Sequence, residues 1–188
     1  LLGVVEGSDE VEFYHRIELT EISGHAKMWL PIASSNTFQT VELLSLKVPG
    51  DHQMLKDDEF GNTILYMELG SSQSKRMVEI AYKIKRLEKA SYEEPGPVDS
   101  KYLEDNLMMP VGGRFTEIAN QAMFGRDASD LMKARALYDY IIDNMRYMKF
   151  GKYGRGDSNY ACDVRTGNCT EFHSFFISLA RSVGIPAR

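Results

Sequence analysis

The hydrophobic period changes along the chain, and this change constrains the fold more than any other feature. Residues 11–19 alternate strictly between apolar and polar types, and the same period of two recurs in residues 77–87. Successive side chains of a strand point to opposite faces, so this alternation is typical of half-buried strands. Beyond residue 111 the apolar residues recur at steps of three and four, which indicates helices. We therefore expect an α+β chain with its strands first.

The strand-rich part predicts an antiparallel β-sandwich over residues 1–88. Further strands are expected at residues 26–30, 37–48 and 63–69. Turn sequences such as Pro49-Gly50-Asp51 and Gly61-Asn62 separate them, because these residue types favour tight turns. Short strands with turns at this spacing are typical of a sandwich.

A proline-rich stretch separates the two periods. Glu93-Glu94-Pro95-Gly96-Pro97 favours extended backbone and lacks hydrogen-bond donors at its prolines, so residues 89–110 are predicted to be a linker. In the second domain, residues 111–188, one helix should carry the Phe115 to Ala122 stripe and end at Gly125. A second should follow the start signal at residues 127–130 and run over residues 131–145.

Charge and hydropathy narrow the classes of partner. The formal net charge is −5, and no apolar run approaches the roughly 20 residues that cross a bilayer. The basic and aromatic residues between 146 and 155 resemble a platform for single-stranded nucleic acid, but cations after a helix also complement its dipole. We expect a soluble chain without a nucleic-acid partner. A signal ahead of residue 1 would direct it to the periplasm or out of the cell, and the compartment stays open.

Two cysteines, Cys162 and Cys169, are too few for a disulfide framework, and no His or Cys spacing accompanies them that would make a metal site. Asn168 and Glu171 have the spacing of a capping box, which places Cys169 in the first turn of a helix that ends at Gly184. By its spacing to Phe172 and Phe176, the sulfur is expected on the buried face of that helix.

A thiol at this position suits acyl transfer. Unpaired N–H groups and the positive end of the helix dipole favour the thiolate, which is the nucleophilic form. The same N–H groups can stabilise the oxyanion that forms when sulfur attacks an amide carbonyl. We expect Cys169 to be the catalytic residue and Cys162 to be a bystander, although a bridge between the two would silence the nucleophile.

The sequence Gly-Asn-Cys-Thr-Glu-Phe-His at 167–173, with Gly-Ile-Pro-Ala-Arg at 184–188, resembles the nucleophile segment of the bacterial transglutaminase-like superfamily. The resemblance implies the helical half of a papain-like core and a Cys-His-Asp triad in that chain order. Only Cys169 matches a triad position; Glu171 and His173 match motif positions without being triad members. We expect these 188 residues alone to have no significant activity. His173 is a weak substitute base, because nothing orients its ring.

The resemblance implies an enzyme that acts on peptide or protein amides through a thioacyl intermediate, with hydrolysis preferred over transfer to an amine and no metal or organic cofactor. A rival interpretation is a non-catalytic binding module that keeps the same fold. The apolar stripe of the last helix is expected to be partly uncovered, which would favour self-association; it consists of Phe172, Phe175, Phe176 and Leu179.

Overall fold

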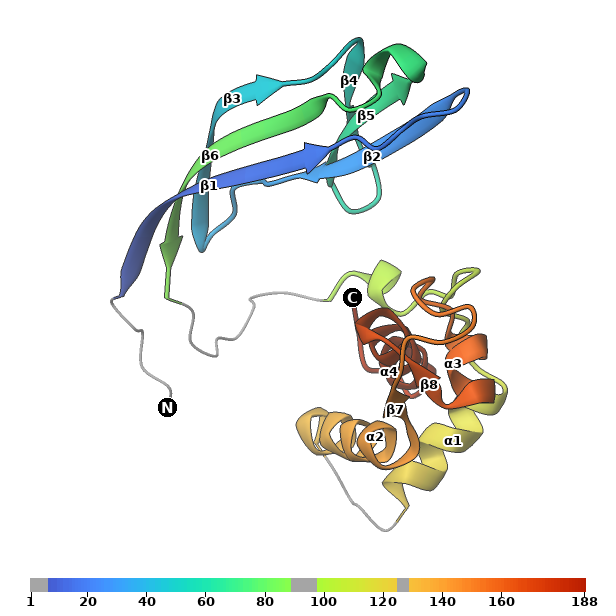
Figure 1. Cartoon of the computed structure of the whole chain (residues 1–188). Helices are drawn as coiled ribbons and strands as arrows, with labels where there is room; N and C mark the ends of the chain where they lie inside the picture. Colours follow the sequence, from blue (N-terminus) through green and yellow to red (C-terminus); the bar gives the residue numbers. More distant parts are fainter. Residues whose placement is uncertain (1–6, 89–97, 125–128) are drawn as a thin grey trace. The chain divides into compact units, whose positions relative to one another are not determined.

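A computed structural model describes residues 7–88, 98–124 and 129–188, in two compact units, Leu1–Glu94 and Pro95–Arg188 (Figure 1). Each unit is described by itself. Residues 89–97 of the predicted linker, the predicted helix end at Gly125 and part of the start signal before residue 130 lie outside the described residues. The limits of the predicted domains therefore stay a prediction.

Six strands of the first unit form two three-stranded antiparallel sheets, ordered β1-β6-β3 and β2-β5-β4 (Figure 1). A short 3₁₀ turn, Ser71–Gln73, precedes β6. The strands are β1 (Ser8–Glu18), β2 (Ala26–Ile32), β3 (Gln39–Lys47), β4 (His52–Lys56), β5 (Thr63–Leu69) and β6 (Met77–Leu87).

The alternation in the sequence explains the core of this unit. Val78, Ile80 and Tyr82 of β6 are buried, and they share one apolar cluster with side chains of β5, including Leu65 and Met67. Side chains from both sheets thus pack together. Strand β4 was not predicted, because its five residues are all exposed and carry no apolar alternation; pairing with β5 holds it in place.

The second unit is helical, with one short parallel pair of strands, so the predicted α+β class, with antiparallel sheets first and helices later, is confirmed. Among the described residues no helix is long and apolar enough to cross a membrane. After the 3₁₀ turn Ser100–Tyr102, its elements are α1 (Arg114–Met123), α2 (Asp130–Asn144), β7 (Arg146–Tyr147), α3 (Ser158–Val164), β8 (Thr166–Gly167) and α4 (Cys169–Ser182).

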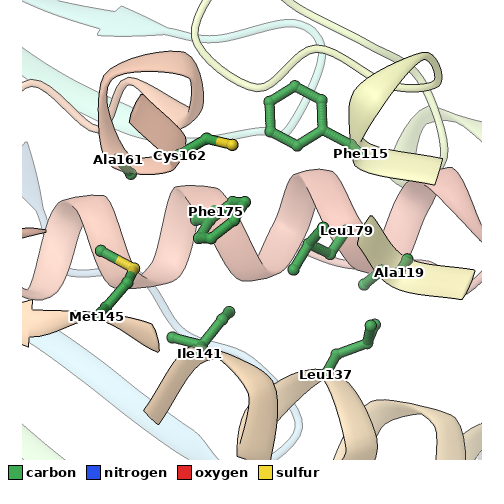
Figure 2. Close-up of a cluster of buried hydrophobic side chains, with 10 residues drawn as sticks. Phe115, Ala119, Leu137, Ile141, Met145, Ala161, Cys162, Phe175 and Leu179 are labelled. Carbon is green, nitrogen blue, oxygen red and sulfur yellow. The ribbon is translucent and has the colours of Figure 1, made fainter. Parts of the chain in front are cut away.

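Helix α4 is the central element of this unit, and α1, α2 and α3 each pack against it (Figure 2). Phe175 and Leu179 of α4 are fully buried, and the Phe175 ring meets Phe115 of α1 edge-on at 6.1 Å between centroids. Burying side chains of this size stabilises a fold by about 1.5–3 kcal/mol each. The α4 packing therefore fixes the direction in which its first turn points.

Hydroxyl groups join α3 to the same helix. The buried Ser158 hydroxyl donates to the Ser174 carbonyl at 2.7 Å and accepts from the Ser178 hydroxyl at 2.8 Å. The sequence analysis missed α3. Its signal is Asp157, whose side chain accepts the backbone N–H of Asn159 and so caps the helix.

Candidate active site

The turn before Cys169 is held by the parallel strand pair. The Met148 N–H donates to the Gly167 carbonyl, and the Arg146 N–H donates to the Arg165 carbonyl, both at 2.9 Å. Strand β7 follows directly from α2, which is packed into the core. The last residues before the nucleophile turn are therefore fixed to the end of a buried helix.

The first turn of α4 has the predicted capping box. The Asn168 Oδ1 accepts the Thr170 N–H at 2.8 Å, and the Glu171 Oε2 accepts the Asn168 N–H at 3.0 Å. Cys169 is the first residue of the helix, and Gly184, with φ of +79°, follows its last turn. Both ends of this helix confirm the prediction.

The environment of the Cys169 side chain corrects one expectation. Cys169 is exposed, whereas the sequence predicted a thiol on the buried face. The strongly buried side of α4 carries Glu171, Phe175 and Leu179, and Phe172 is only partly buried. Residues 169, 172 and 176 occupy the neighbouring strip of α4, where Cys169 is exposed and the two phenylalanines are partly buried. The expectation of an uncovered stripe is accordingly wrong for Phe175 and Leu179.

Within the described part of the chain, His173 has no hydrogen-bond partner that could orient its ring. It is exposed, and neither its ring nor the Cys169 thiol forms a hydrogen bond with any described residue. It borders a mostly apolar hollow of about 290 Å³ together with Tyr138, Ile141, Ile142, Phe172 and Phe176. Within the described ranges, no cluster of three His, Cys, Asp or Glu side chains is placed to hold a metal ion.

Cys162 lies in a different setting. It is buried in the apolar cluster to which α1, α2, α3 and α4 all contribute, and Figure 2 draws it beside Phe115. Both thiols are free, so the two cysteines are not joined. A small buried thiol of this kind behaves as an apolar residue.

Glu171 is the functional residue that sequence reasoning underestimated. Its side chain is fully buried, and its Oε1 accepts the N–H groups of Gly154, Arg155 and Gly156 at 2.8, 3.0 and 3.1 Å. Burial alone would raise the pKa of this carboxyl, but these three N–H groups and that of Asn168 hold its pKa below the usual value. The carboxylate is therefore charged and satisfied by backbone donors.

Gly167 makes room for this carboxylate. A Cβ added at Gly167 would lie 2.4 Å from the Glu171 Cβ, closer than two such atoms can approach. The Gly-Asn-Cys-Thr-Glu motif therefore has a physical explanation: the glycine admits the glutamate, and the glutamate and asparagine cap the helix that starts at Cys169.

One backbone donor stays available at the reactive end. The Thr170 N–H is taken by Asn168, whereas the Cys169 N–H donates to no acceptor among the described residues. An unpaired N–H beside an exposed thiol is the arrangement that stabilises an oxyanion on an attacked carbonyl.

Comparison with known proteins gives a family match that includes Cys169. Residues 117–188 match the model of the Transglutaminase-like superfamily. These residues therefore form part of a transglutaminase-like core, and the recognition made from the nucleophile motif is confirmed.

Two longer proteins are similar to this chain. An uncharacterized protein of Haemophilus influenzae is 22% identical over 185 residues, which is 88% of this chain and 49% of that protein. A crystal structure of a candidate cysteine protease from Cytophaga hutchinsonii superposes with a TM-score of 0.68 at 14% identity, over 95% of this chain and 67% of the other. That likeness shows a shared fold. The chain spans about half the length of the Haemophilus relative.

Proposed function

We propose that Cys169 is the nucleophile of a cysteine enzyme that cleaves peptide or side-chain amides. The observation that carries the proposal is the exposed thiol in the first turn of α4, within the segment that matches the transglutaminase-like model. Cysteine nucleophiles commonly occupy such helix N-termini, because the local field favours the thiolate.

The proposed reaction has two steps. The Cys169 sulfur attacks the amide carbonyl, an S–C bond forms, and the C–N bond breaks as the leaving amine takes up a proton. The unpaired Cys169 N–H is placed to stabilise the oxyanion between these events. Water then attacks the thioester and releases the acid. Transfer to an amine instead of water is the alternative second step.

We assign the proton acceptor to a residue outside the described part of the chain. No described imidazole or carboxylate is hydrogen-bonded to the Cys169 thiol. In the family pattern a His and an Asp follow the nucleophile helix. We therefore assign the roles of base and orienting carboxylate to a His and an Asp of the whole protein.

Turnover of peptide amides by the whole protein tests this proposal. Cys169→Ala should lower turnover at least about a thousandfold, because a triad acts as a unit. Cys162→Ala is the matched control and should leave turnover within about twofold. Full activity of the Cys169→Ala variant would exclude Cys169 as the nucleophile. Added primary amine that diverts the product from acid to amide would show transamidation.

A further inference from the structure

Residues 154–156 lie against the first turn of α4, the turn that carries Cys169. Gly154 and Gly156 have φ angles of +85° and +69°, a backbone conformation that favours glycine. This geometry turns three successive N–H groups, those of residues 154–156, toward one carboxylate oxygen of Glu171. Such a concave set of N–H groups is an anion-binding arrangement, and here a side chain of α4 fills it.

The same backbone lies close to both neighbours of Cys169. A Cβ added at Gly154 would lie 3.7 Å from the Asn168 Nδ2, and one added at Gly156 would lie 3.9 Å from the Thr170 Cβ. Glu171 itself bonds the Asn168 N–H through its other oxygen. One buried carboxylate therefore ties the glycine segment and the first turn of the nucleophile helix together.

This segment carries positive charge in an acidic chain. The net charge is −5, yet residues 146–156 contain four cations and no carboxylate. Of these, Arg155 belongs to the backbone that Glu171 holds, and Lys152 lies two residues before Gly154 in the sequence. Both are exposed, and neither forms an ion pair with a described residue. Neither charge is therefore neutralised by an ion pair within the described part of the chain.

We propose that residues 152–156, of which residues 154–156 are anchored through their backbone by Glu171, form a cationic wall beside Cys169 that favours acyl donors with a negative charge close to the reacting amide. This inference rests on the proposed role of Cys169 and adds a substrate class to it. Lys152 and Arg155 act as specificity residues, and Glu171 acts as a positioning residue.

Charge-matched alkylation measures the wall directly. Iodoacetate and iodoacetamide are nearly the same size but differ by one negative charge. The rate of iodoacetate divided by that of iodoacetamide is measured at Cys169 by peptide mass spectrometry. This ratio is then divided by the same ratio for N-acetylcysteine amide. The normalised ratio reports the local electrostatic field at Cys169 separately from steric access. We expect a normalised ratio of about 3 or more at low salt, falling toward 1 as salt screens the exposed charges.

Substitution assigns the field to the two cations. In the variant with Lys152→Gln and Arg155→Gln the normalised ratio should fall to about 1, a loss of about twofold for each cation. Lys133→Gln is the matched control, because Lys133 lies about 16 Å along α2 from the end that leads into β7. A wild-type ratio of 1 or less, or a ratio that the double variant keeps, would overturn the inference.

Limited trypsin digestion tests the anchor. In the native protein cleavage after Arg155 should be slow, because its N–H and those of its neighbours are bonded to Glu171. Glu171→Gln places an amide NH₂ among N–H donors, and cleavage there should accelerate at least about tenfold below the unfolding temperature. Equal cleavage in wild type and variant would contradict the anchoring role.

The active whole protein extends the test to substrates. Paired peptides with Glu or Gln next to the reacting amide should differ about threefold or more in kcat/KM, and the double variant should remove the difference. An active enzyme without this preference would overturn the inference and leave the proposed function intact. Conversely, absence of turnover with a charge-selective Cys169 would refute the proposed function alone.

Discussion

Cys162 and Cys169 lie seven residues apart and occupy opposite environments. Cys162 is buried in an apolar cluster to which α1, α2, α3 and α4 contribute, and its surroundings are explained by packing. Cys169 is exposed at a helix start, and its surroundings are built from polar groups: a capping asparagine, a buried carboxylate and a glycine segment. The surroundings of Cys169 are thus built from hydrogen-bonded backbone at the surface, whereas the core sets the direction of α4.

The largest expected difference is in alkylation rate. Under native conditions Cys169 should react with iodoacetamide at least about a thousandfold faster than Cys162, because the buried Cys162 thiol is accessible only when the core unfolds locally or globally. The measurement is peptide-resolved mass spectrometry over time. In concentrated urea the two rates should converge to within a small factor. Comparable native rates would show that the core around Cys162 is open and would break the comparison.

Removing the charge of Glu171 should destabilise the fold, and this effect should be smaller than the difference between the two alkylation rates. Glu171→Gln loses charge-assisted hydrogen bonds and leaves buried donors unmatched, so we expect a loss of about 2–4 kcal/mol in the free energy of unfolding. Urea denaturation measures it. Glu117→Gln, at an exposed position in the first turn of α1, should change stability by about 0.5 kcal/mol or less. Equal effects of the two substitutions would contradict the role of the buried carboxylate.

The contribution of Glu171 should depend on pH in a defined direction. Its pKa is lowered in the folded protein, so its stabilisation is fully present above the ordinary glutamate pKa of 4.5 and is lost as pH falls through the folded pKa. The stability difference between wild type and Glu171→Gln should therefore be constant from neutral pH to about pH 5 and shrink below it. A stability difference that grows on acidification would contradict the lowered pKa of Glu171 in the folded protein.

Serine substitution of each thiol should give the smallest effect. Cys162→Ser buries a hydroxyl in an apolar cluster and should cost about 1–3 kcal/mol. Cys169→Ser changes an exposed side chain and should stay within about 0.5 kcal/mol. Thermal or urea unfolding of both variants compares them directly. A larger cost at Cys169 would mean that its thiol contributes to the fold.

Local sequence patterns predicted the regular elements well. Alternation marked β1 and β6, and the capping box located the first turn of α4. Strand β4 escaped because all its residues are exposed and only pairing with β5 defines it. The short helix α3 escaped because its stability comes from long-range bonds such as that from Ser158 to the Ser174 carbonyl.

The site was only partly predictable for a similar reason. Cys169 was identified from its motif and helix position, but its exposure depends on which side of α4 the other helices cover. The role of Glu171 beyond capping depends on a loop that lies about 15 residues earlier in the sequence. No spacing rule of the sequence places that loop beside Cys169. Gly154 and Gly156, which adopt positive φ angles, are a local signal of a tight backbone turn.

The central claim is that the acyl group of the substrate is carried by Cys169. The most direct measurement is mass spectrometry of peptides from the whole protein, quenched with acid during turnover of a slow ester or amide substrate. The account predicts an acyl mass shift on Cys169, removable by hydroxylamine, with none on Cys162 and none after Cys169→Ala. An acyl adduct on another residue, or turnover without any adduct in the Cys169→Ala variant, would contradict it.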